Sequence, residues 1–288
     1  RKNKKTVVEP SMALINIDKK KQYLSNTTDK EKILITIPWM TFGGAETLIY
    51  NYCREINKDF DITFVTGLKS KNEWEHKFRE ITPKIYHLAN MFEDKQLQLE
   101  FICNYIKTRE IEVLHIIHNG FTFELIPEIK KRNPNIKIVV TMFNDRVEYF
   151  GLSLEYEKYV DIFVTDNDKV AQNYKSKVSA SKPVRVIPNG INCYQEFSKK
   201  LYDYVACRKE LGIKDDGVGV FFIGRLSEEK NPDVFVDAAK LVISSSQKND
   251  TKFFIIGDGN MKEEVERRIS DASSKEIKYL GYQPSLEV

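Results

Sequence analysis

The stretch "VGVFFIGRLSEEKNPDVFVDAAKLV" (218–242) joins an apolar run to an amphipathic one through a polar turn. The run 218–223 is rich in β-branched and aromatic residues and is typical of a buried strand. The segment 231–244 repeats apolar residues with helical spacing, with Asn231 as N-cap and Pro232 at the first helical position, where its missing N–H costs nothing. A strand that feeds a helix in this way predicts an α/β fold.

The same alternation of short apolar runs and amphipathic segments extends over the chain from residue 31. The runs expected to form strands are 32–37, 61–66, 84–88, 111–118, 136–141, 160–165, 184–190, 218–223, 251–256 and 277–280. The segments expected to form helices are 45–56, 72–81, 96–109, 121–132, 168–177, 231–244 and 260–273. Strands that alternate with helices imply right-handed βαβ units and parallel sheets.

The pattern restarts after Pro183, which predicts two Rossmann-like domains. We expect a first domain over 31–183 and a second over 184–288, preceded by a basic leader over 1–30. The second domain offers about four strands before the sequence ends, so it is expected to be incomplete. Because the first residue is Arg1, the sequence is expected to be an excerpt of a longer polypeptide.

Charge is unevenly distributed along the 288 residues, which carry 45 Lys and Arg against 42 Asp and Glu, a net charge of +3. Residues 1–30 hold eight basic and three acidic side chains, or +5, so the remainder holds 37 and 39, or −2. A near-neutral body does not fit a nucleic-acid binder. We interpret the leader as a solvated linker, with peripheral contact to anionic lipid as the alternative.

The cysteines are scattered along the sequence and form no C-x-x-C pair. They are Cys53, Cys103, Cys193 and Cys207. This spacing indicates neither a zinc site nor a disulfide framework, so four free thiols are predicted. The sequence has no apolar run near the ~18–20 residues of a membrane span and no signal-peptide pattern at its start. These features favour a reducing, cytoplasmic setting.

Two glycines, Gly43 and Gly44, follow the first predicted strand and begin a helix in "MTFGGAETL" (40–48). Free N–H groups and the helix dipole make such a turn a natural anion site, and glycine permits close approach of a ligand. Closure of a tight loop explains the pair equally well. The spacing is not G-x-G-x-x-G, so a dinucleotide fingerprint is not supported.

A histidine, His118, ends the strand in "LHIIHNG" (114–120). Ligand sites in open α/β sheets lie at the carboxyl ends of strands, which makes His118 a site candidate against the commoner structural role of a lone histidine. His115 lies three residues earlier and is interpreted as a packing residue. The two histidines do not form a metal pair, because strand alternation points them to opposite faces.

Two cations flank the polar turn of the opening stretch, Arg225 just past the strand and Lys230 just before the helix. Cations that converge at a helix N-terminus suit a diphosphate, with bidentate contacts from arginine and a point charge from lysine. Solvated lysines at helix starts are common, so the pair is ambiguous in isolation. The turn Gly257-Asp258-Gly259 in "IIGDGN" (255–260) permits close backbone approach, as does any plain turn.

In combination these motifs resemble a family 4 glycosyltransferase with the GT-B fold. The matching order is "GGAE" (43–46), "HNG" (118–120), "VIPNGIN" (186–192), "FFIGRLSEEKNPDVFVDAAKLV" (221–242), "FFIIGDGNMKEEVERRI" (253–269) and "YLGYQ" (279–283). The resemblance spans 31–288, and the pair "GRLSEEKNP" and "IGDG" is its most specific part. It implies an acceptor-binding first domain and a second domain that binds a nucleotide-sugar, UDP- or GDP-linked.

The resemblance also implies roles for individual residues. Arg225 and Lys230 would grip the donor diphosphate and stabilise its charge as it departs, in place of a metal ion. His118 would lie near the transferred sugar, and Gly43 and Gly44 near the donor phosphates or the acceptor. The turn Gly257-Asp258-Gly259 would border the nucleotide, together with the region of Gly281 and Tyr282. Transfer to a glycan or lipid-linked acceptor would retain anomeric configuration, with no cofactor and no essential metal, and a departing phosphate oxygen would take the acceptor proton.

The sequence departs from the family pattern at three places. Thr47 stands where a basic residue usually follows "GGAE", and Phe143 stands where a histidine often follows the strand 136–141. The acidic E-x7-E segment of the family normally lies beyond the point where this sequence ends, so we expect a truncated donor domain. A non-catalytic GT-B module of a larger protein, binding nucleotide-sugar or a protein partner, therefore stays open. A sugar-nucleotide epimerase is a weaker third alternative.

Overall fold

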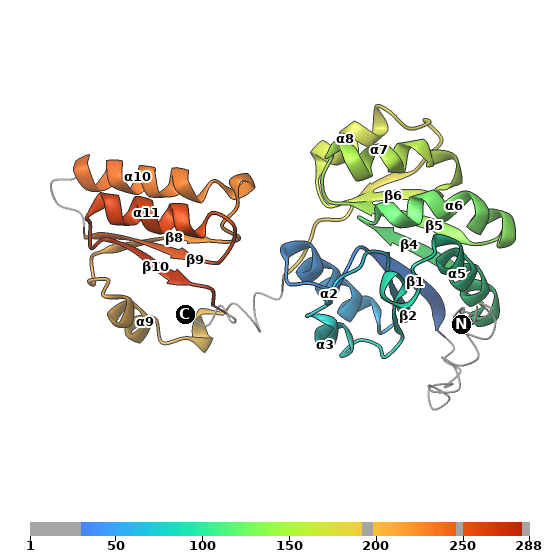
Figure 1. Ribbon diagram of the computed structural model, residues 1–288, viewed down its shortest axis with the longest axis horizontal. Helices are drawn as coiled ribbons and strands as arrows, with labels where there is room; N and C mark the ends of the chain where they lie inside the picture. Colours follow the sequence, from blue (N-terminus) through green and yellow to red (C-terminus); the bar gives the residue numbers. More distant parts are fainter. Residues whose placement is uncertain (1–29, 192–197, 246–249, 284–288) are drawn as a thin grey trace, which may run out of the picture. The chain divides into compact units, whose positions relative to one another are not determined.

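The computed structural model describes residues 30–191, 198–245 and 250–283. The chain divides into two compact units, Arg1–Ile191 and Asn192–Val288 (Figure 1). The predicted basic leader lies outside the described residues, apart from Lys30. Each unit is built around its own parallel β-sheet.

The first unit is a seven-stranded parallel sheet in the order β3-β2-β1-β4-β5-β6-β7. Its strands are β1 (Glu31–Ile37), β2 (Phe60–Thr66), β3 (Ile85–His87), β4 (Val113–Ile117), β5 (Lys137–Met142), β6 (Ile162–Thr165) and β7 (Val184–Val186). Its helices are α2 (Gly44–Ile56), α3 (Glu75–Phe78), α4 (Leu88–Met91), α5 (Lys95–Arg109), α6 (Gly120–Arg132), α7 (Val147–Glu155), η2 (Glu157–Tyr159) and α8 (Asp168–Lys175). The strand order reverses direction between β1 and β4.

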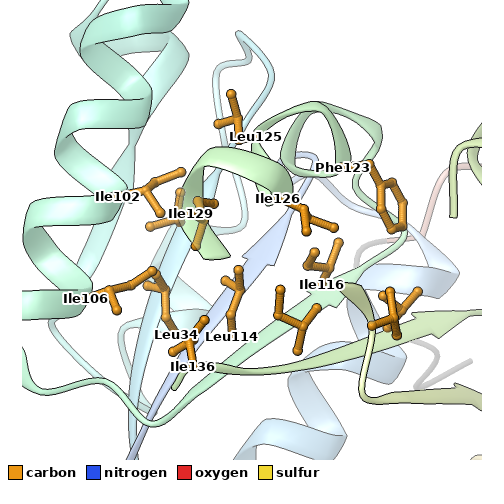
Figure 2. Packing of buried hydrophobic residues seen from close by; sticks show 14 of the residues in the cluster. Leu34, Ile102, Ile106, Leu114, Ile116, Phe123, Leu125, Ile126, Ile129 and Ile136 are labelled. Carbon is orange, nitrogen blue, oxygen red and sulfur yellow. The ribbon is translucent and has the colours of Figure 1, made fainter. Parts of the chain in front are cut away.

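Strand alternation divides the core of the first unit into two clusters, one on each face of the sheet. On β1, Leu34 faces one cluster while Ile33 and Ile35 face the other, and all three are buried. Helices α5 and α6 cover the first face, where Ile102 and Ile126 pack toward the sheet (Figure 2). Helices α2 and α3 contribute to the second cluster. Both faces are covered, as expected for a parallel sheet.

Helix α6 continues through Pro127, as the apolar pattern predicted. A proline inside a helix removes one backbone hydrogen bond and clashes with the preceding turn. Ile126 and Ile129 on either side of it are fully buried against the sheet (Figure 2). Burial of such side chains contributes roughly 1.5–3 kcal/mol each, which offsets the roughly 3 kcal/mol cost of the proline.

The second unit is a three-stranded parallel sheet in the order β10-β9-β8. Its elements are η3 (Lys199–Leu201), α9 (Tyr204–Leu211), β8 (Val218–Ile223), η4 (Glu228–Lys230), α10 (Pro232–Ser245), β9 (Thr251–Ile256), α11 (Lys262–Ala272) and β10 (Ile277–Gly281). Helices α10 and α11 cover one face and α9 lies on the other (Figure 1). Arg268 of α11 pairs with Asp233 and Asp237 of α10, which ties the two helices together.

The strand expected to begin the second domain belongs instead to the first. Residues Val184–Val186 form β7, which pairs in parallel with β6, so the units separate between Ile191 and Asn192 and not after Pro183. The described residues of the second unit accordingly hold three strands and not about four. The prediction took Pro183 as the end of the first domain. In the structure the Pro183 carbonyl accepts a hydrogen bond from Phe163 of β6, so the residues after it continue the first sheet as β7.

Candidate functional site

The candidate site residues of the first unit gather where the strand order reverses, at the carboxyl ends of β1 and β4. These strands are neighbours in register from Ile33 with Val113 to Thr36 with Ile116. The side-chain amide of Asn119 donates to the carbonyl oxygen of Ile37 at 3.1 Å and so joins the two strand ends. Such a reversal is where open α/β sheets bind ligands.

His118 lies at the tip of β4 in a strained backbone conformation, with φ of 50°. Non-glycine residues in this left-handed region cost energy and occur at functional sites more often than elsewhere. Its N–H donates to the carbonyl oxygen of Thr141 at 3.0 Å, which holds the backbone in place. The ring packs against Phe143, nearly parallel at 6.2 Å, and edge-on against Tyr149 at 5.2 Å.

The imidazole of His118 is half-buried, and its Nδ1 atom is buried without a hydrogen-bond partner among the described residues. Burial lowers the pKa of His118, the charge of Arg146 lowers it further, and Glu148 opposes the shift. The ring is therefore held neutral and retains unused hydrogen-bonding capacity. A neutral imidazole suits a residue that positions a hydroxyl group through a hydrogen bond. It is less suited to a residue that carries a proton.

Helix α6 begins beside His118 with its N-cap unused. The N-cap residue, Asn119, is fully buried, and its side chain makes no capping bond. In the described part of the chain, Asn119 Oδ1 and the hydroxyls of Thr36 and Thr122 are buried and unpartnered. The sequence did not predict Asn119 as a site residue, because its place directly after His118 was the one signal that indicated it. Buried polar atoms without partners are rare, and they mark a place where a water molecule or ligand group fits.

His115 belongs to the core, as its place in the strand predicted. It is 4% exposed, and its Nε2 lies 2.8 Å from the hydroxyl of Thr141. Burial lowers its pKa to about 4. Its ring meets that of Tyr52 on α2 edge-on at 5.8 Å.

Gly43 and Gly44 begin α2 at the carboxyl end of β1. Gly43 is the N-cap, in extended conformation, and no side chain caps the helix. A Cβ at Gly44 would meet no heavy atom within 4 Å, so Gly44 borders open space. The uncapped N–H groups retain the positive end of the helix dipole, but the buried carboxylate of Glu46 lies in the same first turn and opposes it. Neither glycine is in the left-handed region.

Arg225 and Lys230 both lie on the connection between β8 and α10. Arg225 is exposed, and among the described residues its side chain has no hydrogen-bond or ion-pair partner. Lys230 ends η4, with its Nζ 3.8 Å from Glu229. Glu228 and Glu229 balance the two cations, so the connection itself carries no net positive charge. The structure thus leaves Arg225 available to a ligand and Lys230 loosely paired.

The turn Gly257-Asp258-Gly259 packs on that same connection, backbone against backbone. Leu226 donates to the carbonyl of Asp258 at 2.9 Å, and Gly224 donates to that of Ile256 at 3.0 Å. Both glycines have positive φ, 141° and 158°. A Cβ at Gly257 would lie 1.9 Å from the carbonyl oxygen of Gly224, and one at Gly259 would lie 2.3 Å from that of Leu226.

These contacts give the glycines a role that the sequence did not reveal. They are required because one loop packs on another, whatever ligand binds nearby. The turn therefore fixes the position of the loop that carries Arg225. At its other end, Gly257 donates to the carbonyl of Gly281 and accepts from the hydroxyl of Tyr279, which ties β10 to the same assembly.

Among the described residues, no three His, Cys, Asp or Glu side chains gather closely enough to hold a metal ion. None of the described helices combines the length and apolar character needed to cross a membrane. Cys53, Cys103 and Cys207 are free thiols, while Cys193 lies outside the described residues.

Solved structures of other proteins share this architecture. HepE of Anabaena in complex with UDP and glucose superposes with a TM-score of 0.67 over 88% of this chain and 70% of that one, at 14% identity. The lipopolysaccharide outer core galactosyltransferase WaaB gives 0.61 over 88% and 68%, also at 14% identity. The fold is that of the GT-B glycosyltransferases. The predicted class, two Rossmann-like domains of GT-B type, is confirmed.

Sequence comparisons agree with this GT-B fold. Residues 206–288 match the family model described as glycosyl transferases group 1. Lipopolysaccharide 1,2-N-acetylglucosaminetransferase of Salmonella typhimurium is 24% identical over 233 residues, 79% of this chain and 55% of that protein. UDP-Gal:alpha-D-GlcNAc-diphosphoundecaprenol alpha-1,3-galactosyltransferase of Escherichia coli is 32% identical over 153 residues, 53% of this chain and 36% of that protein. The chain thus spans about half or less of the length of these relatives, and the match to the group 1 family model covers its residues 206–288.

Proposed function

We propose that this protein transfers a sugar from a nucleotide-sugar to a glycan or lipid-linked acceptor, as a family 4 enzyme that retains anomeric configuration. The observation that carries the proposal is the loop of Arg225, an exposed guanidinium without a partner among the described residues, fixed from beneath by the Gly257-Asp258-Gly259 turn. This loop lies within the segment that matches the group 1 family model. A guanidinium held in this way suits a diphosphate.

In the proposed reaction the second unit binds the donor. Arg225 and Lys230 contact the diphosphate and stabilise the negative charge that develops on it as the bond to the sugar breaks. The Gly257-Asp258-Gly259 turn positions Arg225. A phosphate oxygen of the leaving group accepts the proton of the acceptor hydroxyl, so no separate base is needed. The donor is a UDP- or GDP-sugar. The first is supported by HepE of Anabaena, a protein of similar fold that was crystallised with UDP-glucose and with UDP.

The first unit contributes the acceptor side and the neutral imidazole of His118. A neutral ring with an unpartnered nitrogen accepts a hydrogen bond from a sugar hydroxyl or donates one to it, without adding a charge to the site of the first unit. The uncapped N-terminus of α2 at Gly43 and Gly44 adds N–H donors for the acceptor or the donor phosphates. The names of the two curated relatives, which act on lipopolysaccharide and on a diphosphoundecaprenol-linked sugar, support an acceptor of this class.

The place of action is part of the proposal. Three free thiols among the described cysteines favour a reducing compartment. An acceptor linked to lipid would bring the enzyme to the inner face of the membrane, with the basic leader as a contact to anionic lipid.

A transfer assay tests the proposal. The purified chain is incubated with radiolabelled UDP-glucose, UDP-galactose, UDP-N-acetylglucosamine or a GDP-sugar, and release of the nucleoside diphosphate is followed with and without saccharide acceptors. We expect release with one of these donors in the presence of EDTA, lost in Arg225→Ala and kept in Lys209→Ala, an exposed lysine on α9. NMR of the product would show the retained anomer. UDP binding without turnover in any arm would favour the non-catalytic module.

A further inference from the structure

The imidazole of His118 is held by packing and not by hydrogen bonds. A histidine in a functional site is commonly oriented by a hydrogen bond at one ring nitrogen, which also sets its tautomer. His115 on β4 follows this rule, because its Nε2 lies 2.8 Å from the hydroxyl of Thr141. Among the described residues, no group forms a hydrogen bond with the ring of His118, and its Nδ1 is buried. Contacts with neighbouring rings must therefore orient it.

The backbone of His118 is fixed from both sides of β4. Its N–H donates to the carbonyl oxygen of Thr141 on β5 at 3.0 Å. The next residue, Asn119, is fully buried, and its side-chain amide donates to the carbonyl oxygen of Ile37 on β1 at 3.1 Å. The left-handed conformation of His118, with φ of 50°, is thus held by both neighbouring strands. The backbone is settled, which leaves the ring to be explained.

Tyr149 of α7 supplies the nearer of the two ring contacts described for His118. The rings meet edge-on, with centroids 5.2 Å apart and planes at 82°, a favourable geometry for an aromatic pair. The Tyr149 ring lies directly on Gly120, where a Cβ would come within 2.5 Å of Tyr149 Cε1, while real Cβ atoms essentially never approach below 3.0 Å. Gly120 is therefore required by the position of this ring.

The helix that carries Tyr149 is anchored in the core. Phe150, the next residue, is 3% exposed, and its ring meets that of Tyr174 on α8 at 4.5 Å. One turn later, the hydroxyl of the fully buried Ser153 lies 2.7 Å from the Tyr174 hydroxyl. The Tyr149 ring thus projects from a fixed support, as the residue behind a functional group should.

We infer that Tyr149 is a positioning residue, which holds the ring of His118 in one orientation. The hydroxyl of Tyr149 has no hydrogen-bond partner among the described residues, so the ring and not the hydroxyl carries this role. A misplacement of about 1 Å is enough to impair a catalytic contact. The inference rests on the proposed function for the reaction that His118 serves, while the packing of its ring is measured without any substrate.

The first test is the pKa of His118, measured by NMR in the free protein. The sequence has four histidines, and the resonance of His118 is the one lost in His118→Ala. Burial is the largest cause of its lowered pKa. Tyr149→Ala should therefore raise this pKa toward its ordinary value, whereas Tyr149→Phe, which keeps the ring, should leave it unchanged. Arg146 and Glu148, the charged groups of α7 that also act on the imidazole, are present in both variants.

A pair of glycine substitutions moves the Tyr149 ring without removing it. Gly120→Ala places a methyl group where the ring lies, so it should displace the ring and raise the pKa of His118. Gly151→Ala is the matched control on α7, because a Cβ at Gly151 meets no heavy atom within 4 Å. It should leave the His118 resonance and its pKa unchanged. Should Tyr149→Ala fail to fold, this pair decides the question.

The second test is the turnover of a UDP-sugar. Tyr149→Ala should lower turnover by roughly 2- to 12-fold, the range of one aromatic contact, with UDP affinity unchanged and with turnover restored in Tyr149→Phe. Because Tyr149 acts through His118, Tyr149→Ala should cause no further loss when it is added to His118→Ala. Non-additivity of this kind separates a positioning residue from one that contributes independently.

Several outcomes would overturn the inference. They are a pKa of His118 that stays the same in both Tyr149→Ala and Gly120→Ala, an equal change in Gly151→Ala, and a loss of turnover in Tyr149→Ala that adds in full to that of His118→Ala. Absence of turnover in the wild type with every donor would reject the proposed function alone. The NMR titration would then decide whether Tyr149 positions the ring.

Discussion

Replacing Gly257 by alanine should damage the second unit far more than the same change at Gly224, although the two residues touch. At Gly257, φ is 141° and a Cβ would lie 1.9 Å from the carbonyl oxygen of Gly224, where real Cβ contacts are essentially never below 3.0 Å. At Gly224, the nearest heavy atom to a new Cβ is Phe222 Cε1 at an ordinary 3.9 Å. Gly257 and Gly224 thus differ in backbone strain and in the space for an added Cβ, although they lie in contact with each other.

The cost follows from the contacts that must give way. Backbone strain at Gly257 contributes roughly 1–3 kcal/mol. The loops must separate by about an ångström, which breaks hydrogen bonds such as those from Gly224 to Ile256 and from Leu226 to Asp258, each worth about 0.5–1.5 kcal/mol net. We expect a total loss of roughly 2–6 kcal/mol of unfolding free energy for the second unit.

Thermal and urea unfolding, with hydrogen exchange of the β8 and β9 amides to isolate the second unit, measures the loss. Gly257→Ala should lower the unfolding midpoint and also weaken UDP binding, because Arg225 loses its support. Gly224→Ala should change both by little. Equal stability of the two variants would refute the idea that the Gly257 turn exists to position the Arg225 loop.

Two further predictions concern the histidines. Because burial lowers the pKa of His115 from 6.5 to about 4, the unfolded chain binds more protons between these values, and stability present above pH 6.5 is lost as pH falls toward 4. The loss of unfolding free energy amounts to about 2 kcal/mol between pH 7 and pH 5. The pH dependence of stability should shrink by that amount in His115→Leu and not in the control His76→Leu, at an exposed histidine. Equal stability curves against pH for wild type and His115→Leu would contradict this prediction. His118→Ala should lower the turnover of a UDP-sugar by roughly 2- to 12-fold, which corresponds to one neutral hydrogen bond. UDP affinity should stay unchanged, and His76→Ala serves as the control. Weaker UDP binding at unchanged turnover would contradict the role assigned to His118.

Much of the fold could be predicted because apolar periodicity reports burial directly. The run 251–256 coincides with β9, which is largely buried. The run 218–223 coincides with β8, but the expectation that this strand is buried is wrong, because none of its residues is buried and Val218, Phe221 and Ile223 are exposed. Helices α7 and α9 were missed. In α7, polar and apolar residues do not follow one clear stripe, and α9 packs few of its side chains, none of them buried. The strand Val184–Val186 was found but assigned to the wrong unit, because a strand carries no signal for the sheet that it joins.

The candidate site was predicted only in part, for a related reason. Residue type and place after a strand suggested His118, Arg225 and the glycines, and these positions depend on local sequence. Contacts between distant loops are invisible in a single sequence. Examples are the packing of Gly257 on Gly224 and the hydrogen bond from Asn119 to Ile37, over 82 positions. The role of Arg225 and Lys230 in donor binding stays a prediction.

The most direct test of the account is calorimetric titration of the chain with UDP and with uridine, for the wild type and for Arg225→Ala. A charge-assisted hydrogen bond is worth roughly 1.5–3 kcal/mol, so loss of Arg225 should weaken UDP binding by about 10- to 150-fold. Arg225→Lys should restore only part of it, because the bidentate geometry is lost. Uridine affinity should stay the same in all three proteins, since the guanidinium contacts phosphate and not base. Equal affinity of wild type and Arg225→Ala for UDP would contradict the proposed donor site.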